Sequence, residues 1–363
     1  VDPARQHEHD HIAAPERASI LRRTAPTVTV AADPATIPEG SAPGAVVGPD
    51  AFAAAYAEPA GTEPDLESTD PACIVWTSGT TGEPKGAVYD HARLAAISRN
   101  MGELTADGDR RLVSLPFAHV GYMTRIWDEL AHATTLVLTG EPWSATETLR
   151  LLRDERITVG TGVPTQWELV LGHPDLAITD CSNLRICGIG GSAVAPDLVR
   201  RMREALGCPV MNRYTSTEAG VTTGTRLGDP DEVVAETVGR PASELDLRLV
   251  DGGRDVPEGE VGEILVRSPM VMAGYWQDPD LTATVLDADG WLHTGDLARR
   301  DERGDLRIVG RLKEMYIRGG YNVYPAEVEH VLADHPLVER VAIVGAPAPV
   351  IGEIGVAFVA QQS

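Results

Sequence analysis

The sequence predicts an α/β protein: a large domain of helix-flanked, mostly parallel sheets with a small β-barrel-like part, followed by a small α+β domain. From about residue 72, short apolar runs alternate with helical stretches, which is typical of parallel strands covered by helices. Beyond about residue 240, short strands follow one another across turns such as Asp251-Gly-Gly253. No internal repeat interrupts this order.

The α/β part is predicted from five apolar runs and the helices between them. Ser144 and Glu147 have the spacing of a capping box, so a helix begins there. A second helix begins at Pro196 and carries Leu198 and Met202 on one face. The expected strands are 72–76, 111–115, 135–138, 157–159 and 184–187. Before them, residues 1–70 are Pro-rich and loop-like, with one β-like run at 27–30.

The last part of the chain predicts further strands and one helix. Strands are expected at 245–250, 263–267 and 305–309. In 312–363 a strand precedes a helix that begins at Pro325 and buries Val328, Val331 and Leu332. The apolar stretch 341–360 contains prolines and glycines, so it indicates two short strands and a turn rather than a membrane span.

The composition argues against two classes of partner. The 363 residues carry 31 Lys and Arg against 54 Asp and Glu, a formal charge of 31 − 54 = −23. Nucleic acids and anionic membrane surfaces bind basic patches, so we expect neither as a partner. The four cysteines form no Cys-x-x-Cys pair. Reduced thiols in a chain of this length indicate a cytoplasmic protein.

A ten-residue loop after the first buried strand has the composition of a phosphate site. Glycines let backbone N–H groups approach an anion, hydroxyls add donors, and Lys85, one of only two lysines, adds a point charge. The common P-loop needs Gly-Lys-Ser/Thr, which Lys85 after Pro84 does not provide. The loop is Thr77-Ser78-Gly79-Thr80-Thr81-Gly82-Glu83-Pro84-Lys85-Gly86.

A second glycine-rich segment, 188–193, fits the Gly-x-Gly-x-x-Ala pattern of dinucleotide-binding folds. Those folds carry an acidic ribose-binding residue about 20 positions later. Residues 206–212 contain no acid, and Glu218 lies 30 positions after Gly188. We therefore expect no nicotinamide binding, but a tight loop at Gly190, Gly191 and Ser192 that packs close to a flat ligand.

Several segments together resemble the adenylate-forming (AMP-binding) superfamily and, within it, the acyl-CoA synthetases for fatty or aryl acids. Besides the loop at 77–86 they are Tyr214-Thr-Ser-Thr-Glu218, Gly274-Tyr-Trp276, Trp291-Leu-His-Thr-Gly-Asp296, Gly310-Arg-Leu-Lys313 and Gly319-Gly-Tyr-Asn-Val-Tyr-Pro325. The resemblance is strong over about 70–363. It implies an ATP-dependent, AMP-forming acid–thiol ligase, in which a carboxylate attacks the α-phosphate of ATP and CoA then attacks the acyl-adenylate.

The resemblance also implies roles for single residues. Thr77, Lys85, Thr217 and Glu218 would be catalytic, with Mg²⁺ on the hard carboxylate oxygen of Glu218. Nucleotide contacts are implied for Ser78, Gly79, Thr80, Thr81 and Gly82 at the phosphates, for Tyr214 and Thr215 at the adenine opposite Gly190, Gly191 and Ser192, and for Asp296 and Arg311 at the ribose. His119 and Gly191 would line the acyl pocket, although His119 alone is typical of a structural histidine.

The resemblance further implies a mobile C-terminal domain. It divides the chain into an AMP-binding domain, 1–310, and a partial mobile domain, 311–363, with Lys313 at the hinge. Gly319 and Gly320 would line the channel for CoA. Compared with the family, we expect the chain to lack about a hundred N-terminal residues and the C-terminal loop with the catalytic lysine. Because loss of one such donor costs about 10²–10³-fold in rate, we expect slow adenylation by the chain as given.

The substrate and the final acceptor stay open at this point. Residues 115–123 contain no acid that could hold an α-ammonium, so a fatty, aryl or alicyclic acid is favoured. An enzyme that stops at the acyl-adenylate or passes the acyl group to a carrier protein is one alternative. A non-catalytic nucleotide-binding scaffold is another. A homodimer is compatible with the sequence.

Overall fold

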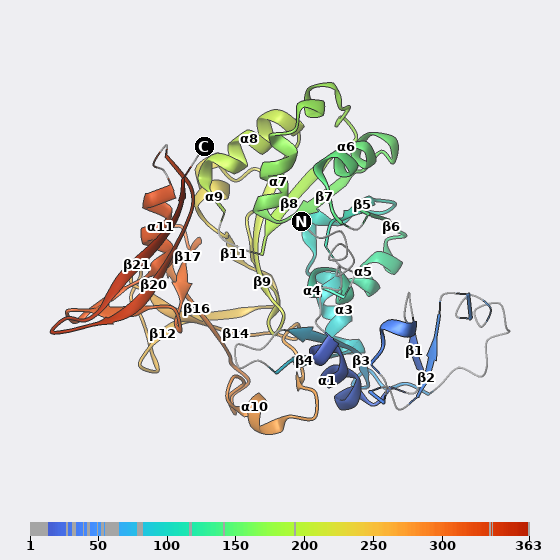
Figure 1. Cartoon of the computed structure of the whole chain (residues 1–363), viewed down its shortest axis with the longest axis horizontal. Coiled ribbons are helices and arrows are strands. Elements are labelled where there is room, and N and C mark those ends of the chain that lie inside the picture. The colour runs from blue at the N-terminus through green and yellow to red at the C-terminus, as the bar shows by residue number, and fades with distance from the viewer. Residues whose placement is uncertain are drawn as a thin grey trace.

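A computed structural model gives the fold of residues 14–26, 28–30, 34–38, 40–41, 44–48, 50–51, 54, 65–77, 83–115, 118–140, 142–191, 194–333, 335 and 337–361. Within these residues the strands form sheets of seven, five, four, three and two strands. Figure 1 shows the seven-stranded sheet with its helices on one side of the molecule and the four-stranded C-terminal sheet on the other. The predicted α/β class with a β-rich later part is confirmed.

The seven-stranded sheet has the order β11-β10-β9-β8-β7-β5-β6. Its strands are β5 (Arg110–Val113), β6 (Thr135–Leu138), β7 (Val159–Gly162), β8 (Ile186–Gly190), β9 (Val210–Ser216), β10 (Gly220–Gly224) and β11 (Arg240–Pro241). β9, β8, β7, β5 and β6 run parallel, and β10 is antiparallel to both of its neighbours, β9 and β11. β7 and β8 begin two residues later than predicted. The two apolar runs begin with the buried residues Ile157 and Leu184. Their amides donate to the carbonyls of Leu152 and Cys181 in the preceding turns and not to a neighbouring strand.

Four helices cover one face of this sheet: α6 (Ala145–Asp154), α7 (Pro164–Leu171), α8 (Pro196–Leu206) and α9 (Asp231–Glu236). The Ser144 hydroxyl accepts a hydrogen bond from the Glu147 amide at 3.2 Å, which confirms the predicted cap. The buried side chains of Trp167 and Met202 pack with Ile189 of β8. A separate cluster lies on the other face, where Leu104, Val159, Ile186 and Met211 meet.

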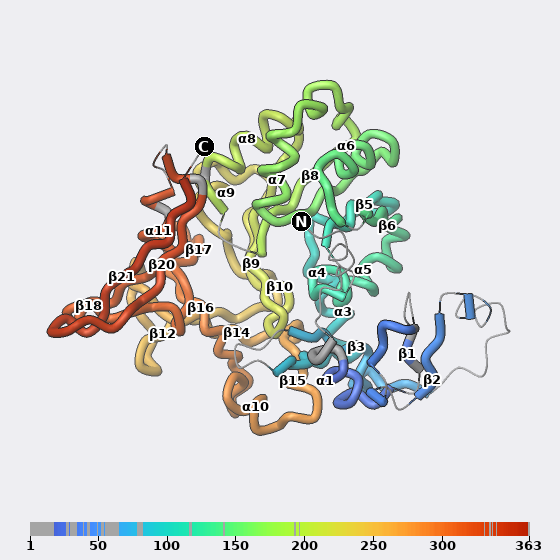
Figure 2. The backbone as a smooth tube through the Cα atoms, viewed as in Figure 1, coloured from blue at the N-terminus to red at the C-terminus, as the bar shows by residue number. Residues whose placement is uncertain are grey.

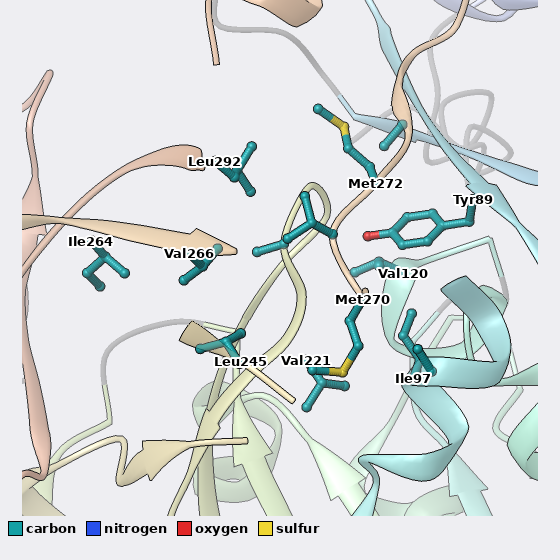
Figure 3. Packing of buried hydrophobic residues seen from close by; sticks show 14 of the residues in the cluster. Tyr89, Ile97, Val120, Val221, Leu245, Ile264, Val266, Met270, Met272 and Leu292 are labelled. Carbon is teal, nitrogen blue, oxygen red and sulfur yellow. The ribbon is translucent and has the colours of Figure 1, made fainter. Parts of the chain in front are cut away.

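A second core joins three sheets around the β9–β10 hairpin. The antiparallel sheet β13-β12-β14-β16-β17 consists of β12 (Asp246–Asp251), β13 (Arg254–Asp255), β14 (Gly262–Arg267), β16 (Leu292–Arg300) and β17 (Leu306–Arg311). The sheet β15-β4-β3 consists of β3 (Pro71–Thr77), β4 (Lys85–Asp90) and β15 (Gly274–Tyr275). Figure 3 shows Tyr89, Met270 and Leu292 packed together with Val221 of β10 and Val266 of β14. This shared core fixes the ends of β4, β9 and β16 relative to one another.

The C-terminal sheet has the order β19-β18-β21-β20. It contains β18 (Tyr316–Arg318), β19 (Tyr321–Val323), β20 (Val338–Ala348) and β21 (Gly352–Gln361), with α11 (Pro325–Ala333) packed on β20 and β17. α11 begins at Pro325 as predicted. The predicted burial of Val331 is wrong, because this residue is 69% exposed, and Val328 and Leu332 are only half-buried. The last two strands are also longer than predicted and form an extended hairpin, red in Figure 2.

The N-terminal part holds α1 (Ala14–Thr24), the 3₁₀ turn η2 (Pro34–Thr36) and the parallel pair β1 (Val28–Val30) and β2 (Ala45–Val47). The β-like run is confirmed as β1, whereas α1 was not predicted. The remaining elements are α3 (His91–Arg99), η3 (Gly102–Leu104), α4 (Val120–Met123), α5 (Ile126–Ala131), η4 (Pro174–Ile178) and α10 (Pro279–Ala283). Across the residues that the structure describes, no helix has both the length and the apolar character needed to cross a membrane.

Candidate active site

The stem of the predicted phosphate loop is the hairpin formed by β3 and β4. Thr77 ends β3, Lys85 begins β4, and the two are cross-strand partners. The Thr77 hydroxyl donates to the Lys85 carbonyl at 3.5 Å. Ser78, Gly79, Thr80, Thr81 and Gly82 lie outside the described residues, so their phosphate contacts stay a prediction. The stem sets where the loop leaves and re-enters the sheet.

Arg23 of α1 contacts both sides of this stem. Its guanidinium lies 5.3 Å from the ring centroid of Trp76 on the entry side, and Nη1 donates to the carbonyl of Pro84 on the exit side. The indole N–H of Trp276 donates to the Arg23 carbonyl at 3.1 Å. Sequence reasoning missed Arg23, because one arginine in a Pro-rich segment with weak family resemblance carries no local signal.

Glu218 lies in the turn between β9 and β10, beside the phosphate-loop stem. The Tyr275 hydroxyl donates to Glu218 Oε1 at 2.9 Å, and Lys85 Nζ lies 5.8 Å from the centroid of the Tyr275 ring. The Tyr89 hydroxyl donates to the Thr217 carbonyl at 2.7 Å and so holds the neighbouring residue. Lys85 and Glu218 are distant in sequence, yet both contact Tyr275. The sequence signalled Tyr275 only as part of the 274–276 motif, without a role.

The predicted ribose residues form a second cluster. Asp296 on β16 and Arg311 on β17 are cross-strand partners, and Arg311 Nε lies 3.1 Å from Asp296 Oδ1. The Tyr214 hydroxyl on β9 donates to Asp296 Oδ2. The Asp296 carboxylate is nearly buried, and each carboxylate oxygen has two lone pairs, so it can still accept hydrogen bonds from hydroxyl groups of a ligand.

Burial shapes the protonation of this cluster. Burial raises the pKa of Asp296 above its ordinary value, although the Tyr214 hydrogen bond and the Arg311 charge act in the opposite direction. Burial and the neighbouring Asp296 charge also raise the pKa of Tyr214. Tyr214 therefore stays protonated at neutral pH and remains a hydrogen-bond donor.

The predicted adenine wall ends next to Tyr214. Gly190, the last residue of β8, is the cross-strand partner of Arg213 on β9. A Cβ atom at Gly190 would lie 2.5 Å from the Arg213 carbonyl oxygen, so only glycine fits there. Gly191 has φ +83°, and Ser192 lies outside the described residues. Thr215 is exposed on β9 opposite Val221, where the β9–β10 register shifts by one residue.

His119 has a local structural role. It precedes α4, and its Nδ1 accepts a hydrogen bond from the Gly121 amide at 3.1 Å. The side chain is otherwise exposed. Its predicted place at the mouth of the acyl pocket stays a prediction, because residues 116 and 117 lie outside the described part of the chain.

The predicted hinge and CoA residues lie on turns of the C-terminal part. Lys313 is exposed between β17 and β18, directly after Leu312, whose amide donates to the Gly295 carbonyl at 2.8 Å. Gly319 and Gly320 form the two-residue turn of the β18–β19 hairpin, with φ +60° and +87°. Positive φ at both positions is typical of a type I′ turn, which favours glycine without any ligand.

A cavity of about 380 Å³ lies beside this linker. Leu312, Met315 and Tyr324 form one side of it, and Glu263 and His293 of the five-stranded sheet form the other. The two parts also meet through an ion pair of Arg299 with Glu327, both about 41% exposed. An exposed ion pair contributes little to the attachment of the C-terminal part to the five-stranded sheet. The hinge at Lys313 stays a prediction.

Comparisons with known proteins identify the family of this chain. Residues 5–276 match the family model described as "AMP-binding enzyme", and the chain belongs to this family. The ATP-bound crystal structure of MatB from Rhodopseudomonas palustris superposes with a TM-score of 0.86 at 30% identity, covering 97% of this chain and 72% of that one.

Curated relatives are CoA ligases. One is a propanoyl:CoA ligase of Mycobacterium tuberculosis whose acyl group carries a 7a-methyl-1,5-dioxo-octahydro-1H-inden-4-yl ring system; it is 43% identical over 294 residues, 79% of this chain and 55% of the relative. Another is indoleacetate–CoA ligase of Aromatoleum aromaticum, 38% identical over 301 residues, 82% of this chain and 61% of the relative. The chain thus spans little more than half the length of the curated relatives that it matches.

Proposed function

We propose that this chain is the nucleotide-binding part of an ATP-dependent carboxylate–CoA ligase that forms AMP and pyrophosphate. One observation carries the proposal: the β9–β10 hairpin reaches both clusters. Tyr214 of β9 contacts Asp296, while Glu218, four residues later, shares Tyr275 with Lys85. The end of β9 and the turn after it therefore connect the predicted sugar site with the phosphate-loop stem within four residues of chain.

The residues fit Mg²⁺ held together with a nucleotide. The part of the chain that the structure describes has no group of three or more His, Cys, Asp or Glu side chains that could hold an ion alone. Mg²⁺ usually binds through one or two carboxylates plus substrate phosphates. Glu218 is half-exposed and uses Oε1 for Tyr275, so Oε2 suits the ion. When bound, the ion would neutralise charge that develops on the phosphates.

The side chains would divide the work along the nucleotide. Lys85, half-buried at the start of β4, would place its ammonium at the phosphates that leave as pyrophosphate. Thr217 would donate to the α-phosphate. Asp296 and Arg311 would bind the ribose, and Tyr214 would lie against the adenine. Lys313 would be the residue about which the C-terminal part turns before CoA enters past Gly319 and Gly320.

The acid that we propose has a large apolar body and no α-amine. The described part of residues 115–123 offers no carboxylate to pair with an ammonium. The relatives named above act, by their names, on acids that carry a fused ring system. We therefore expect ring-bearing acids to be used better than straight-chain fatty acids.

A panel of carboxylic acids assayed for AMP release tests the proposal. The panel should contain arylacetic, hydroxycinnamic, alicyclic propanoic and medium- and long-chain fatty acids, each with and without CoA. AMP release that needs both an acid and CoA supports the ligase. Pyrophosphate exchange without CoA consumption would instead indicate an enzyme that stops at the acyl-adenylate or uses a carrier protein. Thermal stabilisation by ATP without turnover would indicate a non-catalytic scaffold.

A further inference from the structure

The hydroxyl and the ring of Tyr275 contact two different charged residues. The hydroxyl donates to Glu218 Oε1 at 2.9 Å, and the ring centroid lies 5.8 Å from Lys85 Nζ. Tyr275 itself is 7% exposed, whereas Glu218 and Lys85 are each partly exposed. A tyrosine can serve both partners at once because its phenol donates a hydrogen bond while its ring face attracts a cation.

The Tyr275 hydroxyl is the donor of this hydrogen bond, and the Glu218 carboxylate is the acceptor. A hydrogen bond to a charged acceptor is stronger than a neutral one, so it restricts the rotamers of the Glu218 carboxylate.

The backbone around Tyr275 is held from both sides. On one side, the amides of Ala273 and Trp276 donate to the carbonyls of Val88 and Gly86 at 2.8 and 2.7 Å, which extends the β15–β4 pairing. The Met272 amide also donates to the Glu218 carbonyl at 2.9 Å. The segment 272–276 thus connects the end of the phosphate-loop stem directly to the β9–β10 turn.

On the other side, α10 holds Tyr275 through Thr282. The Tyr275 amide donates to Thr282 Oγ1 at 2.8 Å. Gly274 has φ +147°, and a Cβ atom there would lie 2.9 Å from Thr282 Cγ2, so only glycine permits this approach. The phenol of Tyr275 is therefore presented to Glu218 by a backbone with little freedom to move.

We propose that Tyr275 is a positioning residue that aligns Glu218 for the metal ion of a bound nucleotide and holds it in register with Lys85. The proposal rests on the proposed function for the role of Glu218. The Tyr275 hydroxyl holds Glu218 Oε1, so that Oε2 is the oxygen left for the ion, and the Tyr275 ring holds the Lys85 ammonium. Through Tyr275, the cation of the phosphate-loop stem and the metal ligand of the β9–β10 turn act as one unit.

The test is Tyr275→Phe, which removes the hydroxyl and keeps the ring. The measurement is ATP binding by isothermal titration over a series of Mg²⁺ concentrations, with AMP release measured in parallel. We expect the Mg²⁺ concentration for half-maximal ATP binding to rise about tenfold, which corresponds to the loss of one charge-assisted hydrogen bond. Tyr275→Leu, which also removes the cation–π contact, should weaken ATP binding further at saturating Mg²⁺.

Tyr122→Phe is the matched control. The Tyr122 hydroxyl accepts a hydrogen bond from the Ser114 amide at 3.0 Å, in a buried setting on α4. We expect this variant to lower the thermal midpoint and leave the Mg²⁺ dependence of ATP binding within twofold. An unchanged Mg²⁺ dependence in Tyr275→Phe, with a folded protein, would overturn the proposal. If the wild type binds ATP but releases no AMP, the result counts against the proposed function and not against the role of Tyr275. The binding measurement does not need turnover.

Discussion

Asp296 and Arg311 face each other across β16 and β17, with Arg311 Nε 3.1 Å from Asp296 Oδ1, although one side chain is nearly buried and the other is 64% exposed. Arg311 ends β17, two residues before Lys313. A ligand that engages this pair therefore contacts the last residue before the linker. Under the proposed function, Arg311 would therefore contact the ribose directly next to this linker.

Asp296→Asn should weaken ATP binding without lowering the stability of the fold at neutral pH. Asparagine keeps an acceptor for Tyr214 but loses the negative charge and one acceptor for ligand hydroxyls. We expect ATP affinity to fall at least tenfold, because hydrogen bonds to a charged group contribute about 1.5–3 kcal/mol. Isothermal titration with ATP measures this loss. Arg307→Gln, an exposed change on the same β17 strand, should leave affinity unchanged.

The same variant should change the pH dependence of unfolding. Because burial raises the pKa of Asp296, the folded protein binds this proton more readily than the unfolded chain does. The ionisation of Asp296 therefore lowers the free energy of unfolding. This loss develops as the pH rises from about 3.9, the ordinary pKa of Asp, through the raised pKa of the folded protein. Asp296→Asn removes this loss. Urea unfolding of the ligand-free variant between pH 4 and 7 should show a higher free energy of unfolding toward neutral pH than the wild type.

Asp109 should show the opposite pH dependence. Burial opposes its ionisation, but hydrogen bonds from Arg185, Thr158 and the Ala106 amide outweigh this and lower its pKa. Its stabilising contribution is present above the ordinary Asp pKa of about 3.9 and is lost as pH falls through the lowered value. Asp109→Asn should cost about 2 kcal/mol at pH 7, because Arg185 keeps its hydrogen bond to the Glu103 carbonyl but loses its carboxylate partner. Equal stability of the two proteins at pH 7 would contradict this.

Arg23→Ala should weaken ATP binding although Arg23 contacts no predicted ligand. The guanidinium joins Trp76 to Pro84, so its loss frees the ends of the phosphate loop. We expect the Kd for ATP to rise about fivefold to tenfold, on the order of 1 kcal/mol. The neighbouring Arg22 is exposed on the same helix, so Arg22→Ala is the matched control. If both variants bind ATP alike, the stem contact is of no consequence.

Gly320→Ala tests whether this turn has a role beyond its geometry. At φ +87° alanine is strained, although a Cβ atom would meet nothing within 4 Å, so we expect a stability loss of about 1 kcal/mol. Gly304 has φ +82° and equally open surroundings, and Gly304→Ala should cost the same. A rise in KM for CoA in the first variant alone would support the predicted channel. Equal CoA kinetics would reduce Gly320 to a turn residue.

The sequence predicted well the elements whose signal is local. Ser144 indicated the start of α6, Pro196 indicated the start of α8, and Lys85 indicated the stem of the phosphate loop. Helix capping and loop composition involve residues only a few positions apart, so a local pattern reveals them. The pairing of Asp296 with Arg311 required a cross-strand register that no local pattern contains.

Errors and omissions arose at residues whose burial or role depends on neighbours that are distant in sequence. Val331 fits an apolar helix face, yet the packing of α11 on β20 and β17 leaves it exposed. Arg23 and Tyr275 acquire their roles only through contacts with β3, β4 and the β9–β10 turn. A motif can mark Tyr275, but only the fold shows which carboxylate it touches.

The long β20–β21 hairpin also affects how the protein behaves at high concentration. Val344, Ile354 and Phe358 lie on its uncovered side, 49%, 38% and 62% exposed. At low ionic strength the formal charge of −23 keeps molecules apart. Added salt shortens the screening length to about 8 Å at 0.15 M, so that the exposed apolar surfaces of two hairpins can associate. Turbidity should therefore increase as sodium chloride is added, contrary to the behaviour of a protein whose copies associate through opposite charges.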